Sequence, residues 1–104
     1  MTRVDKEFKE SVLKLVLEIP TGRLMTYGQI ATICGAPWAA WEVGQIAHFD
    51  NPKLPWQRVV NKKGGLANGY PGGEDGHRKV LEKEGIEVIN NVVNIEKLIW
   101  WPEK

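Results

Sequence analysis

The feature that most restricts the fold of this chain is a pair of short helix signals separated by a tight turn. Thr26-Tyr27-Gly28-Gln29 has the pattern of a capping box, in which the threonine and the glutamine each satisfy a backbone N–H at the start of a helix. Gly35 is suited to close this helix in the left-handed conformation. A second helix is expected from about Trp38 to Phe49. Two short helices joined by a turn are typical of a helix-turn-helix, and also of an ordinary helical hairpin.

A further helix is expected before this pair. Asp5 is suited to cap it, and Pro20 and Gly22 end it. Its apolar residues recur at helical spacing and are expected in the core: Phe8, Val12, Leu15 and Val16.

The second half of the chain is rich in turn residues between positions 50 and 76. Val59-Val60 and Leu66 are expected to form a small hairpin across Lys63-Gly64-Gly65. A fourth helix is expected over about Asp75–Glu84, followed by a short strand over Ile86–Val93, and the apolar tail 98–102 is expected to pack back on the body. We therefore predict a mostly α fold with a small β wing, of the helix-turn-helix (winged-helix-like) type.

Length and composition limit the classes of function. The 104 residues fit one small domain, expected to span residues 1–104. No run of about 18 apolar residues occurs, and the charged N-terminus does not resemble a signal peptide, so we expect a cytoplasmic protein that does not enter membranes. One cysteine and two histidines are too few for a structural zinc site of the usual spacing, and no metal or cofactor is expected. The net charge of +1 does not favour nucleic-acid binding.

A set of ordered motifs runs along nearly the whole chain, centred on Pro55-Trp56-Gln57-Arg58-Val59. The others are Ile19-Pro20-x-Gly22, Thr26-Tyr27-Gly28-Gln29-Ile30-Ala31, Val43-Gly44, Asn51-Pro52, Gly69-Tyr70-x-Gly72-Gly73 and Leu81-x-x-Glu84-Gly85. With these motifs the chain resembles the C-terminal domain of O6-alkylguanine-DNA alkyltransferases, whose active-site motif reads Pro-Cys-His-Arg-Val. Because Trp56 stands at the cysteine position, the chain looks like the alkyltransferase-like branch, which binds lesions without transferring the alkyl group.

The chemistry of the substituted positions favours the same interpretation. Removing an alkyl group from O6 of guanine needs a thiolate in line with the alkyl carbon and a base that takes the thiol proton. The indole of Trp56 is no such nucleophile. Gln57 stands at the histidine position, and an amide is no general base near neutral pH. We therefore expect no catalytic residue.

The resemblance implies a lesion pocket built from Pro55, Trp56, Tyr70 and Gly72. Trp56 would present a flat apolar wall to an extruded base. The glycine-rich segment 69–73 would close over that base, with Tyr70 as its aromatic contact. The ordinary alternatives are a core tryptophan and a plain glycine-rich turn, since the segment lacks the residue order of a phosphate-binding loop.

The resemblance also implies that the helix after the turn lies in the minor groove of DNA. Slim residues on that helix suit this groove, which is narrow and admits small side chains or apolar wedges. Tyr27 would press on the phosphate beside the target nucleotide. The residues expected to contact DNA are Thr26, Tyr27, Gln29, Ala40, Trp41, Gly44 and Gln45.

Trp41 is where the sequence departs from the family. An arginine usually stands there and fills the space left by the flipped nucleotide. Trp41 could stack on the unpaired base as an apolar wedge, or it could pack into a core or against a partner. Glu42 beside it adds a negative charge near the phosphates.

Three further side chains have implied or open roles. The family pattern joins Arg58 and Glu84 in an ion pair that braces the active-site loop against the following helix. Cys34 has no histidine near it in sequence and is expected to be a small buried residue.

The leading hypothesis is a monomeric, non-enzymatic sensor that flips O6-alkylguanine out of double-stranded DNA and marks it for nucleotide excision repair. Bound to DNA, it would be associated with the nucleoid. One alternative is a scaffold or interaction domain that has lost lesion binding, which Trp41, Glu42 and the near-neutral charge favour. The other is a methyltransferase that uses Cys34 in a new geometry.

Overall fold

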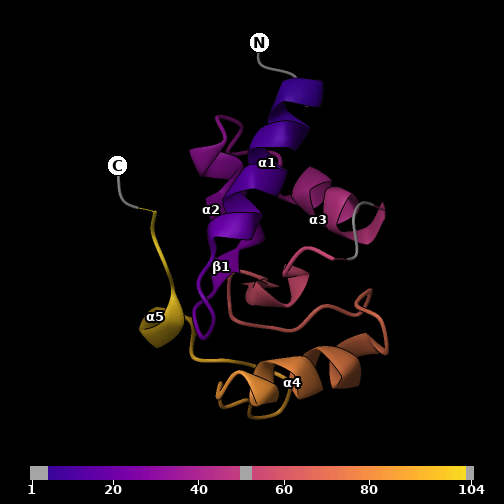
Figure 1. Ribbon diagram of the computed structural model, residues 1–104, viewed down its shortest axis with the longest axis vertical. Helices are drawn as coiled ribbons and strands as arrows, with labels where there is room; N and C mark the ends of the chain where they lie inside the picture. The colour runs from indigo at the N-terminus through magenta and orange to yellow at the C-terminus, as the bar shows by residue number, and fades with distance from the viewer. Residues whose placement is uncertain (1–4, 50–52, 103–104) are drawn as a thin grey trace.

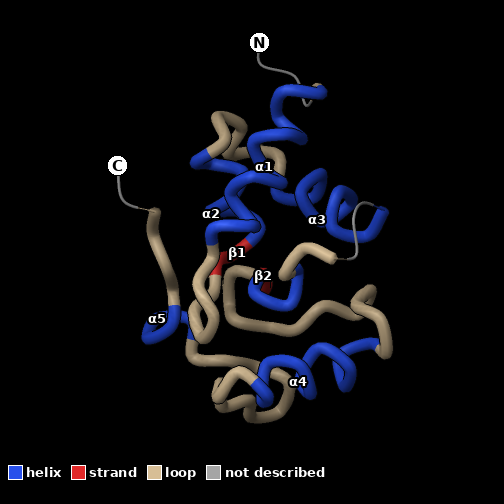
Figure 2. The backbone as a smooth tube through the Cα atoms, in the orientation of Figure 1, coloured by secondary structure: helices blue, strands red, loops and turns tan. Residues whose placement is uncertain are grey.

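The computed structural model describes residues 5–49 and 53–102, which form a mainly helical fold with one small sheet (Figures 1 and 2). Its elements in chain order are α1 (Lys6–Glu18), β1 (Met25–Thr26), α2 (Tyr27–Ile33), α3 (Ala40–Phe49), the 3-10 turn η1 (Trp56–Arg58), β2 (Val59–Val60), α4 (Gly73–Lys83) and α5 (Ile95–Leu98). The predicted fold class is confirmed. In the described ranges, no helix is long and apolar enough to cross a membrane.

Helix α1 begins and ends where its sequence predicts. The Asp5 carboxylate accepts a hydrogen bond from the Phe8 N–H at 3.0 Å, which satisfies a donor that the first turn leaves free. Ile19 then adopts an extended conformation before Pro20, so the helix stops at Glu18. Its four predicted apolar positions are all buried.

The capping box at the start of α2 is confirmed. Thr26 Oγ1 accepts from the Gln29 N–H at 3.0 Å, and Gln29 Oε1 accepts from the Thr26 N–H at 3.1 Å. Gly35 follows the helix with a φ of 95°, a left-handed conformation that glycine adopts without steric cost. Helices α1, α2 and α3 pack against one another at one end of the molecule (Figure 1).

Helix α3 begins at Ala40, two residues later than predicted. The residues before it form a turn closed by a hydrogen bond from the Ala39 N–H to the Ala36 carbonyl at 2.8 Å. This turn leaves Trp38 exposed, outside the helix. Helix α4, by contrast, begins earlier than predicted: it starts at Gly73, after the left-handed Gly72, rather than near Asp75.

The predicted hairpin of Val59-Val60 with Leu66 is wrong. Strand β2 instead pairs in parallel with β1, in the register Met25↔Val59 and Thr26↔Val60. The Asn61 side chain closes the intervening turn by accepting from the Gly65 N–H at 2.7 Å. Leu66 then donates its N–H to the Asn91 carbonyl, so this segment pairs with residues much later in the chain.

The predicted strand over Ile86–Val93 is also wrong. Asn90 and Asn91 have φ values of 53° and 60°, and they reverse the chain so that Ile89 and Val92 bridge each other. Asparagine tolerates this left-handed conformation better than most residues. The segment is therefore a tight turn, with Val92 also bridged to Gly65.

The short parallel sheet joins two buried clusters. Met25 and Val59 belong to the cluster formed with α1, α2 and α3, whereas their neighbours Leu24 and Val60 belong to a second cluster with Leu81 of α4. Adjacent residues of a strand point to opposite faces, so two-residue strands are enough to connect the two cores. The chain end packs back on the body as predicted, since the Trp100 N–H donates to the Leu24 carbonyl at 2.8 Å.

Candidate functional site

A pocket of about 850 Å³ lies between α3, the start of α2 and the loops that flank η1 and β2. Most of its lining is apolar or uncharged, as expected for a site that takes a flat organic group. The lining residues are Tyr27, Gly28, Ala40, Trp41, Gly44, Gln45, Ala47, His48, Leu54, Trp56, Asn61, Lys62, Ala67, Gly69, Tyr70 and Pro71.

One face of α3 forms a side of this pocket. The four residues predicted to contact DNA from this helix, Ala40, Trp41, Gly44 and Gln45, all lie on it. Ala47 and His48 continue the same face at helical spacing, and that spacing could have identified them from the sequence. Trp41 is 70% exposed, so the alternative that it packs into the core is wrong.

Trp56 is both a core residue and a wall of the pocket. Only 7% of its surface is exposed, because η1 directs the ring into the cluster formed with α1, α2 and α3. The two alternatives that the sequence left open are therefore compatible. Within the described residues, its Nε1 is the one buried side-chain polar atom without a hydrogen-bond partner.

Tyr70 lines the pocket on the loop before α4. Its ring stacks on the imidazole of His77, with centroids 4.7 Å apart and ring planes at 17°. Gly76 allows the loop to lie this close to α4, because a Cβ at that position would overlap the Pro71 carbonyl. Burial raises the pKa of the Tyr70 phenol, and the Glu84 carboxylate raises it further. The phenol is therefore neutral at physiological pH.

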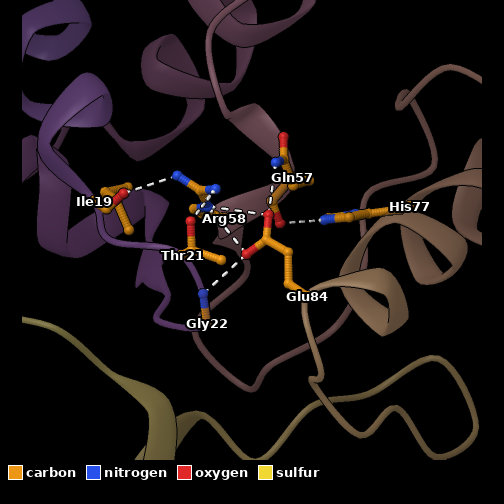
Figure 3. A network of polar contacts seen from close by, with 7 residues as sticks. All are labelled: Ile19, Thr21, Gly22, Gln57, Arg58, His77 and Glu84. Carbon is orange, nitrogen blue, oxygen red and sulfur yellow. Dashed lines mark hydrogen bonds and ion pairs between the residues drawn. The ribbon is translucent and has the colours of Figure 1, made fainter.

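Arg58 and Glu84 form the ion pair that the resemblance implied, with Arg58 Nε 3.1 Å from Glu84 Oε1 (Figure 3). The Arg58 guanidinium also donates to the Ile19 carbonyl and to Thr21 Oγ1, both at 2.9 Å. Glu84 in turn accepts from the Gly22 N–H at 2.9 Å. The pair thus ties the segment after α1 to η1 and to the end of α4.

Gln57 is part of this network rather than of the pocket. Its Nε2 donates to Glu84 Oε2 at 2.8 Å (Figure 3). Burial opposes ionisation of Glu84, but the hydrogen bonds from Arg58, Gln57 and Gly22 outweigh it and lower the pKa of the carboxyl. The Gln57 amide is therefore held as a structural donor.

Four residues predicted for the site do not line the pocket. Pro55 and Gly72 lie next to lining residues in the chain but are not themselves part of the wall. Thr26 and Gln29 are buried, and their side chains are used inside the protein: beside the capping box, Gln29 Nε2 donates to the Trp100 carbonyl at 2.6 Å. This corrects the expectation that these two side chains contact DNA. The motif Asn51-Pro52 lies outside the described residues.

Tyr27 lies at the start of α2, half-buried, on the edge of the same pocket. Burial raises the pKa of its phenol, which is therefore neutral at physiological pH. A neutral hydroxyl can stand beside a phosphate without charge repulsion. Among the described residues that line the pocket, Lys62 is the one lysine or arginine, and none is Asp or Glu.

Cys34 is half-buried, rather than buried as predicted, and it is not part of this pocket. It lies at the end of α2 in a separate surface depression lined by α1 residues such as Phe8 and Lys14. Burial raises the pKa of its thiol, which lowers the fraction of reactive thiolate.

His77 was not predicted from the sequence. Its ring is fully buried and forms hydrogen bonds to two separate backbone segments, at Gln57 and at Ala67. A lone histidine in a helix carries no sequence signal for such contacts, because both partners come from segments that the tertiary fold brings to α4. In the described residues, no cluster of three His, Cys, Asp or Glu side chains could hold a metal ion.

Comparison with known proteins gives consistent matches. Residues 7–86 match the model of the 6-O-methylguanine DNA methyltransferase DNA-binding domain. The chain is 35% identical to Alkyltransferase-like protein 1 of Schizosaccharomyces pombe, covering 92% of this chain and 96% of that one. It is 34% identical to the DNA base-flipping protein of Vibrio parahaemolyticus serotype O3:K6 (strain AQ3810), covering 92% and 98%.

A solved structure extends the likeness to three dimensions. The S. pombe alkyltransferase-like protein in complex with damaged DNA containing O6-carboxymethylguanine superposes with a TM-score of 0.85 at 34% identity. The match covers 97% of this chain and 100% of that one.

Proposed function

Because this chain belongs to the family of the 6-O-methylguanine DNA methyltransferase DNA-binding domain, as an alkyltransferase-like protein, we propose that it recognises O6-alkylguanine in double-stranded DNA and leaves the lesion unrepaired. The relative with a DNA-bound structure was solved with O6-carboxymethylguanine in the DNA, which supports a lesion of this class as the ligand.

The observation that carries the proposal is the pocket itself. At about 850 Å³ it is large enough for a purine with a substituent, and four Trp and Tyr side chains line it, among them Trp56 and Tyr70. Every base has a flat π-face, and stacking such a face on an aromatic ring contributes about 1–3 kcal/mol. A base inside a duplex cannot reach a pocket of this kind, so the target nucleotide must be flipped out of the stack.

The pocket supports binding without chemistry. Trp56 stands where a nucleophile would be needed, and Gln57 is bonded to Glu84 rather than directed at a reacting group. The chain's single cysteine, Cys34, lies in a different depression and its pKa is raised. A base held against Trp56 therefore meets no thiolate, which argues against the methyltransferase alternative.

The shape of α3 favours an approach from the minor groove. Ala40, Gly44 and Ala47 keep the pocket face of the helix slim, while Trp41 projects from it with 70% of its surface exposed. An apolar side chain in this position can enter the stack and fill the space that the flipped nucleotide leaves. Lys62, which lines the pocket from the loop after β2, supplies a positive charge for a phosphate.

A bound lesion that is not repaired must be handed to another system. We propose that the complex marks the site for nucleotide excision repair, and that the protein acts as a monomer in the cytoplasm, associated with the nucleoid when bound to DNA. Recruitment of repair proteins would fit a protein that detects damage but lacks the groups to remove it.

The proposal is tested by titrating the protein with two duplexes that differ only in one base, O6-methylguanine in one and guanine in the other. We expect tighter binding to the lesion duplex, with fluorescence changes from Trp41 and Trp56 on that duplex. Equal affinities for the two duplexes would overturn the proposal.

A second candidate function is an interaction domain that has lost lesion binding. The observation that favours it is the exposure of two tryptophans close together in sequence, Trp38 at 59% and Trp41 at 70%. Exposed aromatic side chains are common in protein interfaces. This candidate predicts equal affinities for the two duplexes, and that Trp38→Ala and Trp41→Ala leave DNA binding unchanged.

A further inference from the structure

One buried imidazole connects the segments that carry two aromatic side chains of the pocket, Trp56 and Tyr70. His77 Nε2 lies 2.7 Å from the Gln57 carbonyl oxygen, and Gln57 follows Trp56 directly (Figure 3). Its Nδ1 accepts a hydrogen bond from the Ala67 N–H at 3.0 Å, and Ala67 lines the pocket. Its ring face stacks on Tyr70. One side chain on α4 therefore contacts the segments that carry both aromatic side chains.

These contacts fix the protonation state of the imidazole. Nδ1 faces a backbone N–H, so it must be the unprotonated acceptor, and Nε2 must carry the hydrogen that it donates to the Gln57 carbonyl. Protonation of Nδ1 would place two N–H groups against each other and break the contact to Ala67. The ring is fully buried, so water cannot replace the lost bond without a rearrangement.

The titratable groups around His77 come from several elements. Tyr70 stacks on the ring from the loop, Glu74 lies on the same helix, and the Arg58–Glu84 ion pair lies on the other side of Gln57. Burial lowers the pKa of His77, against smaller raising effects of the bond to Gln57 and of Glu74. The imidazole is therefore neutral at physiological pH.

We propose that His77 is the positioning residue of the lesion pocket: it holds the Trp56 segment and the Tyr70 loop at the spacing that accepts an alkylated base, so that discrimination between lesion and normal DNA requires a neutral His77. This inference rests on the proposed function. Acid would weaken lesion binding while the protein stays folded, because the Ala67 contact would be lost on the Tyr70 side of the pocket.

The test measures the affinities for the lesion duplex and the undamaged duplex between pH 5.5 and 8, with circular dichroism to verify that the protein is folded at each pH. We expect the ratio of the two affinities to be constant at neutral pH and to fall below pH 6.5, by about fivefold, the equivalent of one neutral hydrogen bond. In His77→Gln the ratio should be independent of pH, because an amide does not titrate. Lys79→Gln is the matched control, since it changes an exposed residue of the same helix outside the pocket and should keep the acid-dependent fall.

A second measurement keeps the inference testable if His77→Gln folds poorly. The ¹⁵N chemical shifts of the His77 imidazole in the wild-type protein should be those of a ring protonated on Nε2 alone at pH 7.5, changing together with the affinity ratio as the pH falls. A ratio above one that does not change with pH, or that still falls in His77→Gln, would overturn the role of His77 and leave the proposed function standing. A ratio of one at every pH would overturn the proposed function and the inference with it.

Discussion

Two tryptophans that line the same pocket differ in burial. Substitution of the buried one affects both packing and binding, whereas substitution of the exposed one tests binding alone. Trp56 is 7% exposed and contributes to the core, whereas Trp41 is 70% exposed and can be changed without disturbing packing. The resemblance implies a cysteine and an arginine at these two positions in the catalytic relatives.

Trp56 should supply a stacking surface rather than a hydrogen bond. Its Nε1 is buried and therefore out of reach of a bound base, which leaves the carbon surface of the ring for contact. Trp56→Phe should retain the preference for lesion DNA. Trp56→Ala should weaken lesion binding by about 1–3 kcal/mol and change binding to undamaged duplex far less. Fluorescence anisotropy with the two duplexes measures this, and equal losses on both would show a folding defect instead of a lost contact.

Trp41 should act by shape alone. Trp41→Ala should lower lesion affinity without changing the dependence of affinity on salt, because an apolar wedge releases no phosphate counterions. Trp41→Arg should tighten binding and make the salt dependence steeper. Since the side chain is exposed, the free energies of unfolding of both variants should lie within about 0.5 kcal/mol of the wild-type value. A salt dependence that changes in Trp41→Ala, or lesion binding that is unaffected by either change, would contradict the wedge.

At the scale of elements, one ion pair joins three segments that are distant in sequence. Arg58 and Glu84 link η1 and the end of α4 to the residues after α1, with side-chain exposures of 17% and 10%. The Arg78 pairs with Asp75 and Glu82 lie on the surface of a single helix, with carboxylate exposures of 72% and 45%. The difference in burial predicts different contributions to stability.

Glu84→Ala should lower the free energy of unfolding by about 3 kcal/mol, because it leaves a mostly buried guanidinium without its partner. Arg78→Ala is the matched control on the same helix and should cost less than about 1 kcal/mol, as exposed pairs do. Urea unfolding followed by circular dichroism measures both values. Similar losses in the two variants would show that the Arg58–Glu84 pair does not brace the fold.

The elements that were predicted correctly depend on local interactions. The Asp5 cap, the Thr26 capping box and the left-handed Gly35 each involve residues within a few positions of one another, so the sequence contains the whole interaction. The predicted hairpin is wrong because both of its segments have distant partners. Val59 pairs with Met25, and Leu66 donates to Asn91, and no periodicity in the sequence identifies such partners.

The site residues divide in the same way, into those that local spacing predicts and those that only the tertiary fold brings together. The slim face of α3 could be predicted because its residues recur at helical spacing, and it extends to Ala47 and His48. His77 could not be predicted, because its partners Gln57 and Ala67 reach it only through the tertiary fold. Motif resemblance placed Trp56 and Tyr70 together, but it also assigned to DNA contact two residues, Thr26 and Gln29, that the fold buries.

At the scale of the whole molecule, acid should lower stability in two stages. The pKa of His77 is lowered from its ordinary 6.5, so below that pH the unfolded chain binds a proton that the folded protein does not, and the free energy of unfolding falls. The pKa of Glu84 is also lowered, from 4.5, so a further loss follows as the pH falls below that value and through the folded pKa. Urea unfolding between pH 3 and 8 measures the profile. His77→Gln should remove the first stage, and a wild-type free energy that is constant from pH 7.5 to 5 would contradict it.

The most direct test of recognition without repair uses one sample. An excess of protein is incubated with a duplex that contains O6-methylguanine, binding is verified against the matched guanine duplex, and the complex is then dissociated in denaturant. Mass spectrometry of both components should find the protein at its original mass and the methyl group still on the base, after preferential binding to the lesion duplex. A protein that has gained one methyl group, DNA in which guanine has been restored, or equal binding to both duplexes would contradict the account.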